Sequence, residues 1–204
     1  EQGCIDGYVP LYVKQRLEAK ISGQYIIGIT GEIGAGKSYV GNLLVEFGKE
    51  KNIQIHNIEM DMIGHRILGE LTDPVYVELR AEIAEMFGKE VLKSGGFIDR
   101  KVLGEIVFNN PEKMKQLNKL MYTPLITRLR REIYGKKGVI LLNAALLAEL
   151  GLTNLCNNNF IFVKTDKDVQ MRRLRERGLS DEQINRRLES QYSGEEKMMA
   201  CKNA

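Results

Sequence analysis

The most constraining feature of the sequence is one glycine-rich stretch. Its residues are Gly31-Glu32-Ile33-Gly34-Ala35-Gly36-Lys37-Ser38, and they match the pattern G-x-x-x-x-G-K-[ST] at every fixed position. Glycines let successive backbone N–H groups turn toward phosphate oxygens, the lysine reaches the terminal phosphates, and the serine hydroxyl is a ligand for Mg²⁺. The stretch therefore predicts a loop that binds the phosphates of a nucleotide.

The residues on either side of this loop have the pattern that such a loop needs. Residues 25–30 form a short apolar run typical of a buried strand, and residues 39–47 continue as a helix with an apolar stripe. A helix that begins at the loop directs its N-terminal dipole at the anion. We therefore expect Ser38 to bind the metal and the phosphates to contact Gly31, Gly34, Ala35, Gly36, Lys37, Ser38 and Tyr39.

Composition limits the class of protein. The chain has 204 residues, 43% of them hydrophobic and 28% charged, which suits one globular domain with an inserted lobe. A net charge of +3 is too weak to indicate a nucleic-acid partner. Apolar runs are too short for a membrane span. Three cysteines, Cys4, Cys156 and Cys201, have neither disulfide nor zinc spacing, so we expect a cytoplasmic protein.

The first 24 residues precede the first predicted strand. Their apolar spacing is helical in part, and they form either an N-terminal arm or the end of a preceding domain in a fusion protein. We expect the phosphate-loop domain to occupy residues 25–204.

Two carboxylates end the second predicted strand, residues 53–61. Glu59 and Asp61 are two residues apart, so both side chains can point to one face of a strand. The carboxyl ends of parallel strands form the ligand crevice, which places Asp61 beside the phosphates. There it can position a hydroxyl nucleophile, accept its proton, or hold Mg²⁺ through water. The alternative is that Asp61 only caps a helix starting at Met62; His65 is interpreted as a surface or packing residue.

The strand signal then disappears until residue 134, and helices replace it. Asp99 is a predicted N-cap, and Asn110-Pro111 is a typical helix start. Residues 74–134 therefore predict an inserted helical lobe that receives the substrate. Three arginines in it are interpreted as a solvated helix face rather than a phosphate clamp: Arg128, Arg130 and Arg131.

Two further strands are predicted at residues 139–142 and 159–165. Asn143 follows the first of them, where many phosphate-loop proteins have an acidic residue, and an amide cannot supply negative charge to a metal. The pattern as a whole predicts an α/β fold, with a three-layer parallel sheet, the helical lobe, and a helical lid.

The predicted lid, residues 172–195, is rich in arginine. Arg172, Arg173, Arg175 and Arg177 precede Gly178, and a capping box at Ser180 opens a second helix with Arg186 and Arg187. Two such helices joined by a glycine hinge can bring charge onto a transferring phosphoryl group. The alternative is a solvated charged face with glutamates as helix partners.

The order of these parts resembles the dephospho-coenzyme A kinase family. The resemblance runs from about Ile26 to the chain end, and its motifs are residues 28–38, Ile58-Glu59-Met60-Asp61, residues 99–108, and Leu188-Glu189-Ser190-Gln191. It implies ATP and Mg²⁺ as cofactors and phosphorylation of the ribose 3′-hydroxyl of dephospho-coenzyme A. It also implies Lys37, Asp61 and Arg177 as catalytic residues, with Asp61 at the acceptor hydroxyl and Arg177 in the lid.

Three positions depart from the family pattern. Glu59 replaces an aspartate, Asn143-Ala144-Ala145 stands where D-V-P is common, and Thr123 occupies the place of a frequent histidine. The chain also ends at Ala204, before the adenine-lining segment of similar proteins. Two alternatives stay open: another small-metabolite or nucleoside kinase on the same scaffold, or a non-catalytic nucleotide-binding module of a fusion protein.

Overall fold

The computed structural model describes residues 23–156 and 159–202. The predicted arm at residues 1–24 lies outside these residues except for Gly23 and Gln24, and Gln24 is already the first residue of a strand. Cys4 also lies outside them.

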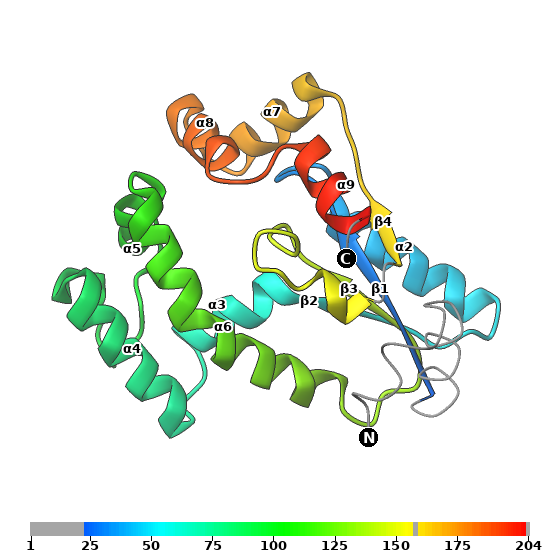
Figure 1. The fold of residues 1–204 in the computed structure, drawn as a ribbon, viewed down its shortest axis with the longest axis horizontal. Helices are drawn as coiled ribbons and strands as arrows, with labels where there is room; N and C mark the ends of the chain where they lie inside the picture. The colour runs from blue at the N-terminus through cyan, green and yellow to red at the C-terminus, as the bar shows by residue number, and fades with distance from the viewer. Residues whose placement is uncertain (1–22, 157–158, 203–204) are drawn as a thin grey trace.

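A four-stranded parallel sheet forms the centre of the molecule (Figure 1). Its strand order is β2-β3-β1-β4. The strands are β1 (Gln24–Thr30), β2 (Ile55–Glu59), β3 (Gly138–Asn143) and β4 (Phe160–Phe162). Because all four run in the same direction, their carboxyl ends meet at one edge of the sheet, where ligands of open α/β proteins bind.

Helices and the loops between them make up the rest of the described chain. One helix, α2 (Lys37–Glu50), follows β1. Between β2 and β3 lie α3 (Met60–Gly69), α4 (Pro74–Phe87), the short η2 (Lys89–Val91), α5 (Arg100–Phe108) and α6 (Pro111–Ile133). The short η3 (Thr153–Cys156) precedes β4, and α7 (Lys167–Glu176), α8 (Asp181–Glu189) and α9 (Gly194–Lys202) follow it.

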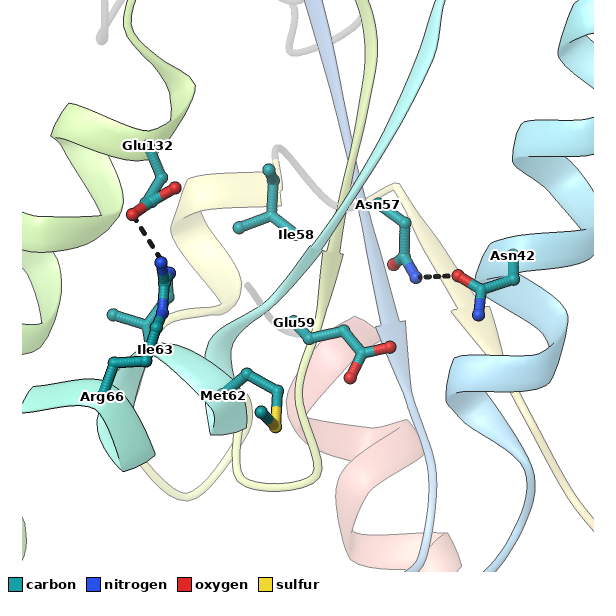
Figure 2. Close-up of a pocket in the computed structure, with 8 residues that line it drawn as sticks. All are labelled: Asn42, Asn57, Ile58, Glu59, Met62, Ile63, Arg66 and Glu132. Atoms are coloured by element: carbon teal, nitrogen blue, oxygen red, sulfur yellow. Dashed lines mark hydrogen bonds and ion pairs between the residues drawn. The ribbon is translucent and has the colours of Figure 1, made fainter. Parts of the chain in front are cut away.

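Alternating residues of β2 point to opposite faces of the sheet. Asn57 points toward α2 and Ile58 toward α6, so helices cover both faces, as the predicted three-layer fold requires (Figure 2). Helix α2 packs closely against β2 because a glycine, Gly41, lies at the contact. A Cβ atom on Gly41 would lie 2.7 Å from the Asn57 side chain.

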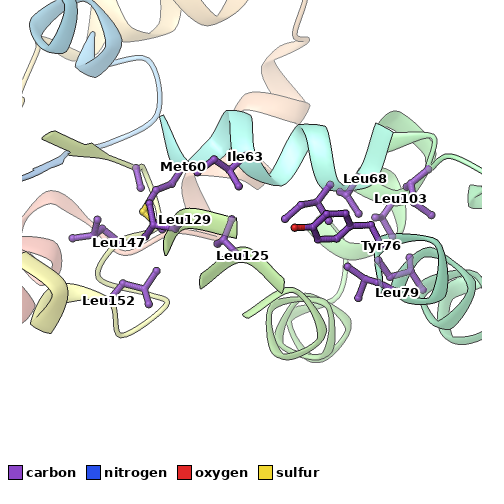
Figure 3. Packing of buried hydrophobic residues seen from close by; sticks show 14 of the residues in the cluster. Met60, Ile63, Leu68, Tyr76, Leu79, Leu103, Leu125, Leu129, Leu147 and Leu152 are labelled. Atoms are coloured by element: carbon purple, nitrogen blue, oxygen red, sulfur yellow. The ribbon is translucent and has the colours of Figure 1, made fainter. Parts of the chain in front are cut away.

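A continuous hydrophobic core joins the sheet to the helical lobe (Figure 3). Ile140 of β3 and Ile63 of α3 are 0% and 1% exposed, and Tyr76 of α4 is 1% exposed. Each fully buried side chain of this size contributes about 1.5–3 kcal/mol. The lobe is therefore packed into the same core as the sheet rather than attached through a linker.

Local signals in the lobe act as predicted. The Asp99 carboxylate accepts hydrogen bonds from the backbone N–H groups of Lys101 and Val102 at 3.0 and 3.4 Å, and so caps α5. The Asn110 side chain accepts from Glu112 and Lys113 at 3.1 Å and caps α6, with Pro111 in the first turn. These side chains satisfy backbone donors that the first helical turn leaves unpaired.

Two predicted strands are shorter in the structure. Instead of continuing to Asp61, β2 ends at Glu59, because Met60, Ile63 and Ile67 pack into the core at helical spacing. The prediction that Glu59 and Asp61 share one strand face is therefore wrong. The strand β4 has only three residues because it pairs only with Gly28–Thr30 of β1.

The alternative role of Asp61 as a helix cap is also wrong. Helix α3 begins at Met60 and its N-cap is Glu59, so Asp61 already lies inside the first turn. Among the described residues, every helix is too short or too polar to cross a bilayer.

Candidate active site

The glycine-rich loop joins the end of β1 to the start of α2. Gly31, Gly34 and Gly36 have φ angles of 145°, 79° and 104°, which residues with a Cβ atom rarely adopt. Gly36 is the N-cap of α2 and no side chain caps the helix. The backbone N–H groups of the first turn therefore suit an external anion, and a phosphate group fits this loop.

Lys37 lies folded against the loop. Its side chain is buried, and Nζ donates hydrogen bonds to the carbonyl oxygens of Gly31 at 3.1 Å and Glu32 at 3.0 Å. Burial lowers its pKa to about 8, an effect that Asp61 opposes. Ser38 and Tyr39, the next residues, are exposed at the start of the helix. The loop thus holds the positively charged side chain of Lys37 beside the predicted phosphate site.

Asp61 lies in the first turn of α3 and interacts electrostatically with Lys37. The side chain reaches solvent but is recessed among many protein atoms, and this desolvation raises the pKa of its carboxyl. Lys37 and the backbone at Ala145 oppose the rise in the pKa. Tertiary packing thus brings together the loop lysine and the carboxylate that the sequence predicts.

Arg177, the third predicted catalytic residue, is exposed at the end of α7. It lies near enough to Lys37 to lower the pKa of that amine. Its neighbours are engaged elsewhere: Arg172 pairs loosely with Glu176 at 3.9 Å, and Arg175 binds Asp181 through two hydrogen bonds of 2.7 and 3.1 Å. Arg177 is thus the arginine of α7 and its C-cap that acts electrostatically on Lys37.

The loop also has partners that the sequence did not suggest. Arg173 donates from one nitrogen to the carbonyl oxygens of Gly34 at 3.3 Å and Ala35 at 3.1 Å. Gln170, one helical turn earlier, donates to the carbonyl of Ile33 at 2.7 Å. Helix α7 therefore holds the loop through main-chain atoms of the loop, which carry no sequence signal.

Glu32 binds the loop to the C-terminal helices. One oxygen of its carboxylate accepts from the backbone N–H of Gly194 at 3.1 Å, and the other from Gln170 at 3.4 Å. In the pattern G-x-x-x-x-G-K-[ST] this residue is a variable position. Nothing in the motif therefore distinguishes it.

A buried ion pair joins α9 to the chain segment that follows β3. Lys197 of α9 is 0% exposed, donates to the carbonyl oxygen of Ala145 at 2.6 Å, and pairs with the Glu149 carboxylate. Both charges act electrostatically on Lys37. Sequence reasoning missed this pair because Lys197 directly follows Glu195 and Glu196, which suggest an exposed helix.

Asn143 ends β3 at the position where an acidic residue is common. It is 4% exposed, and its amide donates to Asn57 at 3.5 Å, which in turn donates to Asn42 at 3.0 Å. In the described part of the chain, no three His, Cys, Asp or Glu side chains are grouped as metal ligands. Mg²⁺ suits such a site because it keeps several waters and binds substrate phosphates, so the Ser38 hydroxyl fits as its protein ligand.

A cleft of about 290 Å³ lies along the edge of β2 (Figure 2). Glu59 and Met62, which lie two positions before and one position after Asp61, line it together with Asn42, Asn57, Ile58, Ile63, Arg66 and Glu132. Arg66 and Arg128 both pair with Glu132, at 3.0 and 2.9 Å.

Arg131 pairs with Asp73 at 3.4 Å and Arg130 is exposed, as expected for a solvated helix face. His65 is exposed as well.

A parallel sheet whose first strand leads through a glycine-rich loop into a helix, with a buried lysine at the junction, defines a P-loop nucleotide-binding protein. Comparisons with known proteins narrow this class. The family described as dephospho-CoA kinase matches residues 25–203.

Curated relatives agree with that match. A dephospho-CoA kinase of Dehalococcoides mccartyi is 37% identical over 179 residues, covering 85% of this chain and 83% of the relative. One from Fusobacterium nucleatum is 34% identical over 180 residues, covering 85% and 84%. The crystal structure of TT1252 from Thermus thermophilus has a TM-score of 0.67 at 29% identity, covering 86% of this chain and 84% of that one.

The chain belongs to the dephospho-CoA kinase family, whose members are phosphotransferases that use ATP. This confirms the resemblance and the predicted α/β fold. It does not favour the two alternative classes of function, since the curated relatives named here carry the same description.

Proposed function

We propose that the protein transfers the γ-phosphoryl group of ATP to the 3′-hydroxyl of dephospho-coenzyme A, which yields coenzyme A and ADP. The observation that carries this proposal is the position of Lys37, in the loop after β1, and of Asp61, in the first helical turn after β2, together with their electrostatic interaction. This arrangement supports a phosphate-donor site beside a proton acceptor. Family membership supports the choice of acceptor.

In the proposed reaction Asp61 accepts the proton of the 3′-hydroxyl as its oxygen attacks the γ-phosphorus. The bond between the γ-phosphorus and the bridging oxygen breaks, and the electron pair leaves with ADP. Lys37 binds the β- and γ-phosphates and stabilises their charge as this bond breaks. The pKa of about 8 leaves the amine mostly protonated at pH 7, as this role requires.

Mg²⁺, which Ser38 and the phosphates would hold, adds positive charge at the β- and γ-phosphates. We assign the remaining phosphate contacts to the backbone N–H groups of Gly34, Ala35, Gly36 and Tyr39, with Gly31 allowing the turn. Arg177 in the lid approaches the transferring group on closure. The lobe of residues 74–134 receives the acceptor. The buried, free thiols of Cys156 and Cys201 suit a reducing cytoplasm.

The test is phosphate transfer from ATP and Mg²⁺ to a panel of acceptors. We expect coenzyme A, identified by mass spectrometry, from dephospho-coenzyme A and no product from pantothenate or adenosine. Preferred transfer to pantothenate or adenosine would overturn the acceptor assignment in favour of another metabolite kinase. Nucleotide binding without transfer to any acceptor would identify a non-catalytic module.

A further inference from the structure

Glu32 lies in the glycine-rich loop and joins it to two elements that come much later in the chain. One oxygen of its carboxylate accepts a hydrogen bond from the backbone N–H of Gly194, the first residue of α9, at 3.1 Å. The other oxygen accepts from the Gln170 side chain of α7 at 3.4 Å. Both neighbours donate, so a carboxylate, whose two oxygens only accept, matches both of them.

Both partners of Glu32 are themselves held by the fold. Gln170 is 3% exposed and donates a second hydrogen bond to the carbonyl oxygen of Ile33 at 2.7 Å. Helix α9 is anchored by Lys197, which is 0% exposed and donates to the carbonyl oxygen of Ala145 at 2.6 Å. Glu32 therefore connects the loop to two fixed points rather than to exposed side chains.

The loop needs such support because of its glycines. Gly31, Gly34 and Gly36 have positive φ angles, and glycine loses more conformational freedom on ordering than any other residue. A ligand that binds only the ordered loop binds more weakly when the ordered fraction falls. A contact that fixes Glu32, between the first two of these glycines, therefore increases the affinity of the loop for phosphate.

We propose that Glu32 is a positioning residue for the nucleotide: by linking the glycine-rich loop to the start of α9, it keeps the loop in its phosphate-binding shape before ATP binds. The link is reciprocal, so bound nucleotide also stabilises the start of α9. This proposal rests on the proposed function in one respect, that the loop binds the phosphates of ATP, and it does not depend on the acceptor.

The decisive variant, Gly194→Pro, removes one N–H and changes no charge. Gly194 is the first residue of α9 and its φ is not positive, and proline is well tolerated at the first position of a helix. The cap of the helix does not use the Gly194 N–H. The Ser193 hydroxyl accepts from the backbone N–H of Glu196 at 3.3 Å, and the Glu196 carboxylate accepts from that of Ser193 at 2.7 Å. The variant therefore deletes the donor to Glu32 and preserves the cap.

The matched control is Gly194→Ala, which keeps the N–H. A Cβ atom at this position would lie 3.4 Å from the Phe162 ring and 3.6 Å from the Glu32 carboxylate, and both are ordinary contacts. Isothermal titration calorimetry with ADP compares the two variants. We expect the Kd for ADP to be roughly fivefold to twentyfold higher in Gly194→Pro than in Gly194→Ala. Equal affinities would overturn the proposal.

A second variant, Glu32→Ala, tests whether the effect passes through the carboxylate. It removes a negative charge from the loop, so electrostatics alone predicts tighter ADP binding, whereas loss of the link predicts weaker binding. In the Glu32→Ala background, Gly194→Pro and Gly194→Ala should bind ADP equally, because all these changes act on one link. Unchanged or tighter ADP binding by Glu32→Ala would contradict the proposal, and so would a difference between the two Gly194 variants that persists in this background.

Hydrogen exchange measures the link without turnover. In the absence of nucleotide, the amides of residues 32–36 should exchange faster in Gly194→Pro than in Gly194→Ala. ADP should slow exchange at residues 195–198 of α9 in the wild type, and it should slow it less in Glu32→Ala. Equal loop exchange in the two Gly194 variants would show that Glu32 does not hold the loop.

These measurements separate this proposal from the proposed function. A protein that binds ADP but phosphorylates no acceptor contradicts the proposed function, and the two Gly194 variants then still decide the role of Glu32. Phosphorylation of dephospho-coenzyme A, with equal ADP affinity in the two variants, contradicts only the role of Glu32. A wild-type protein that binds no ADP contradicts both.

Discussion

At the scale of single residues, the candidate site depends on one buried positive charge, that of Lys37, at the place where a phosphate would bind. Lys37 is 8% exposed and two backbone carbonyls accept its hydrogen bonds at 3.0 and 3.1 Å. Burial disfavours the charged amine in the protein without nucleotide, and Asp61 recovers part of that cost. The lysine side chain is therefore positioned for a phosphate, at a cost in the folding stability of the protein without nucleotide.

Lys37→Met should abolish phosphoryl transfer and leave the fold intact, because the amine acts on phosphate charge rather than on packing. Its effect on stability should depend on pH. The folded pKa of about 8 lies below the ordinary 10.5, so between these values the unfolded chain binds more protons and the wild-type protein gains stability as pH rises. The free energy of unfolding of the wild type, relative to the variant, should rise by at most about 3 kcal/mol across this window.

Urea unfolding without nucleotide, at several pH values between 7 and 11, measures this difference. A difference that stays constant with pH, or turnover close to wild type, would contradict the assignment of Lys37.

Asp61→Asn should lower kcat far more than it raises the KM for ATP, because the carboxylate acts on the acceptor hydroxyl in the transition state. Burial raises the pKa of Asp61, so its ionised form costs stability, and that cost appears as pH rises through the raised pKa. At pH 7 we therefore expect the variant to be at least as stable as the wild type. Steady-state kinetics and thermal unfolding check the two parts; a destabilised variant with normal kcat would refute this role.

At the scale of elements, the two arginine-rich helices contact both sides of the site. Helix α7 holds the glycine-rich loop through Gln170 and Arg173. Helix α8 reaches the lobe, where the Arg187 guanidinium lies 5.2 Å from the centre of the Phe108 ring of α5, and burial lowers the pKa of Arg187. Gly178, with φ of 81°, lies in the turn between them.

Arg177→Lys should lower kcat substantially, since lysine keeps the charge but loses the planar fork that matches phosphate oxygens. Arg172→Lys is the matched control, because the Arg172 side chain is 69% exposed and weakly paired. Both replacements preserve net charge and nearly preserve helix propensity. Turnover at saturating ATP and acceptor compares them, and equal activities would show that Arg177 belongs to a solvated surface.

Phe108→Leu should loosen α8 by removing the contact between the lobe and Arg187. Such a contact contributes about 0.5–2 kcal/mol, and more as the cation is removed from water. Phe47→Leu is the control, because it removes a similar contact with Lys51, 5.7 Å from the ring, on α2. Hydrogen exchange of the α8 amides should become faster only in Phe108→Leu; unchanged exchange there would mean that the stacking does not hold the helix.

At the scale of the whole molecule, the continuous core makes the sheet and the lobe one unit. Cys156 packs beside Gly28 of β1, and a Cβ atom on Gly28 would lie 3.0 Å from its sulfur. Burial raises the pKa of Cys156 to about 12, and Cys201 is 9% exposed in α9. Among the described residues, both thiols are therefore shielded from solvent.

Thiol labelling should therefore report unfolding of the molecule. In a Cys4→Ser background, we expect Cys156 and Cys201 to react far more slowly than a free thiol. Because ATP binds only the folded protein, it should slow both reactions by the factor 1 + [ATP]/Kd when opening is fast relative to labelling. Mass spectrometry of the labelled protein measures the rates. Fast labelling that ATP leaves unchanged would show that these cysteines are accessible in the folded state.

Some features of this protein follow from sequence alone because they depend on residues close together in the chain. The glycine-rich loop needs three glycines and a lysine at fixed spacing, and the caps at Asp99, Asn110 and Ser180 need one polar side chain before a helix. The residues that each of these features needs lie within about one helical turn of one another. Sequence therefore predicted the loop, most helices and the parallel sheet.

Other features were decided only by tertiary structure. Asp61 lies in a helix rather than a strand because the core draws Met60 inward, and Lys197 is buried because Glu149 and the Ala145 carbonyl, about fifty positions earlier in the chain, compensate it. Arg173 and Glu32 bind main-chain groups, which every residue possesses. Such contacts leave no pattern in the sequence, because they join segments that only the folded chain brings together.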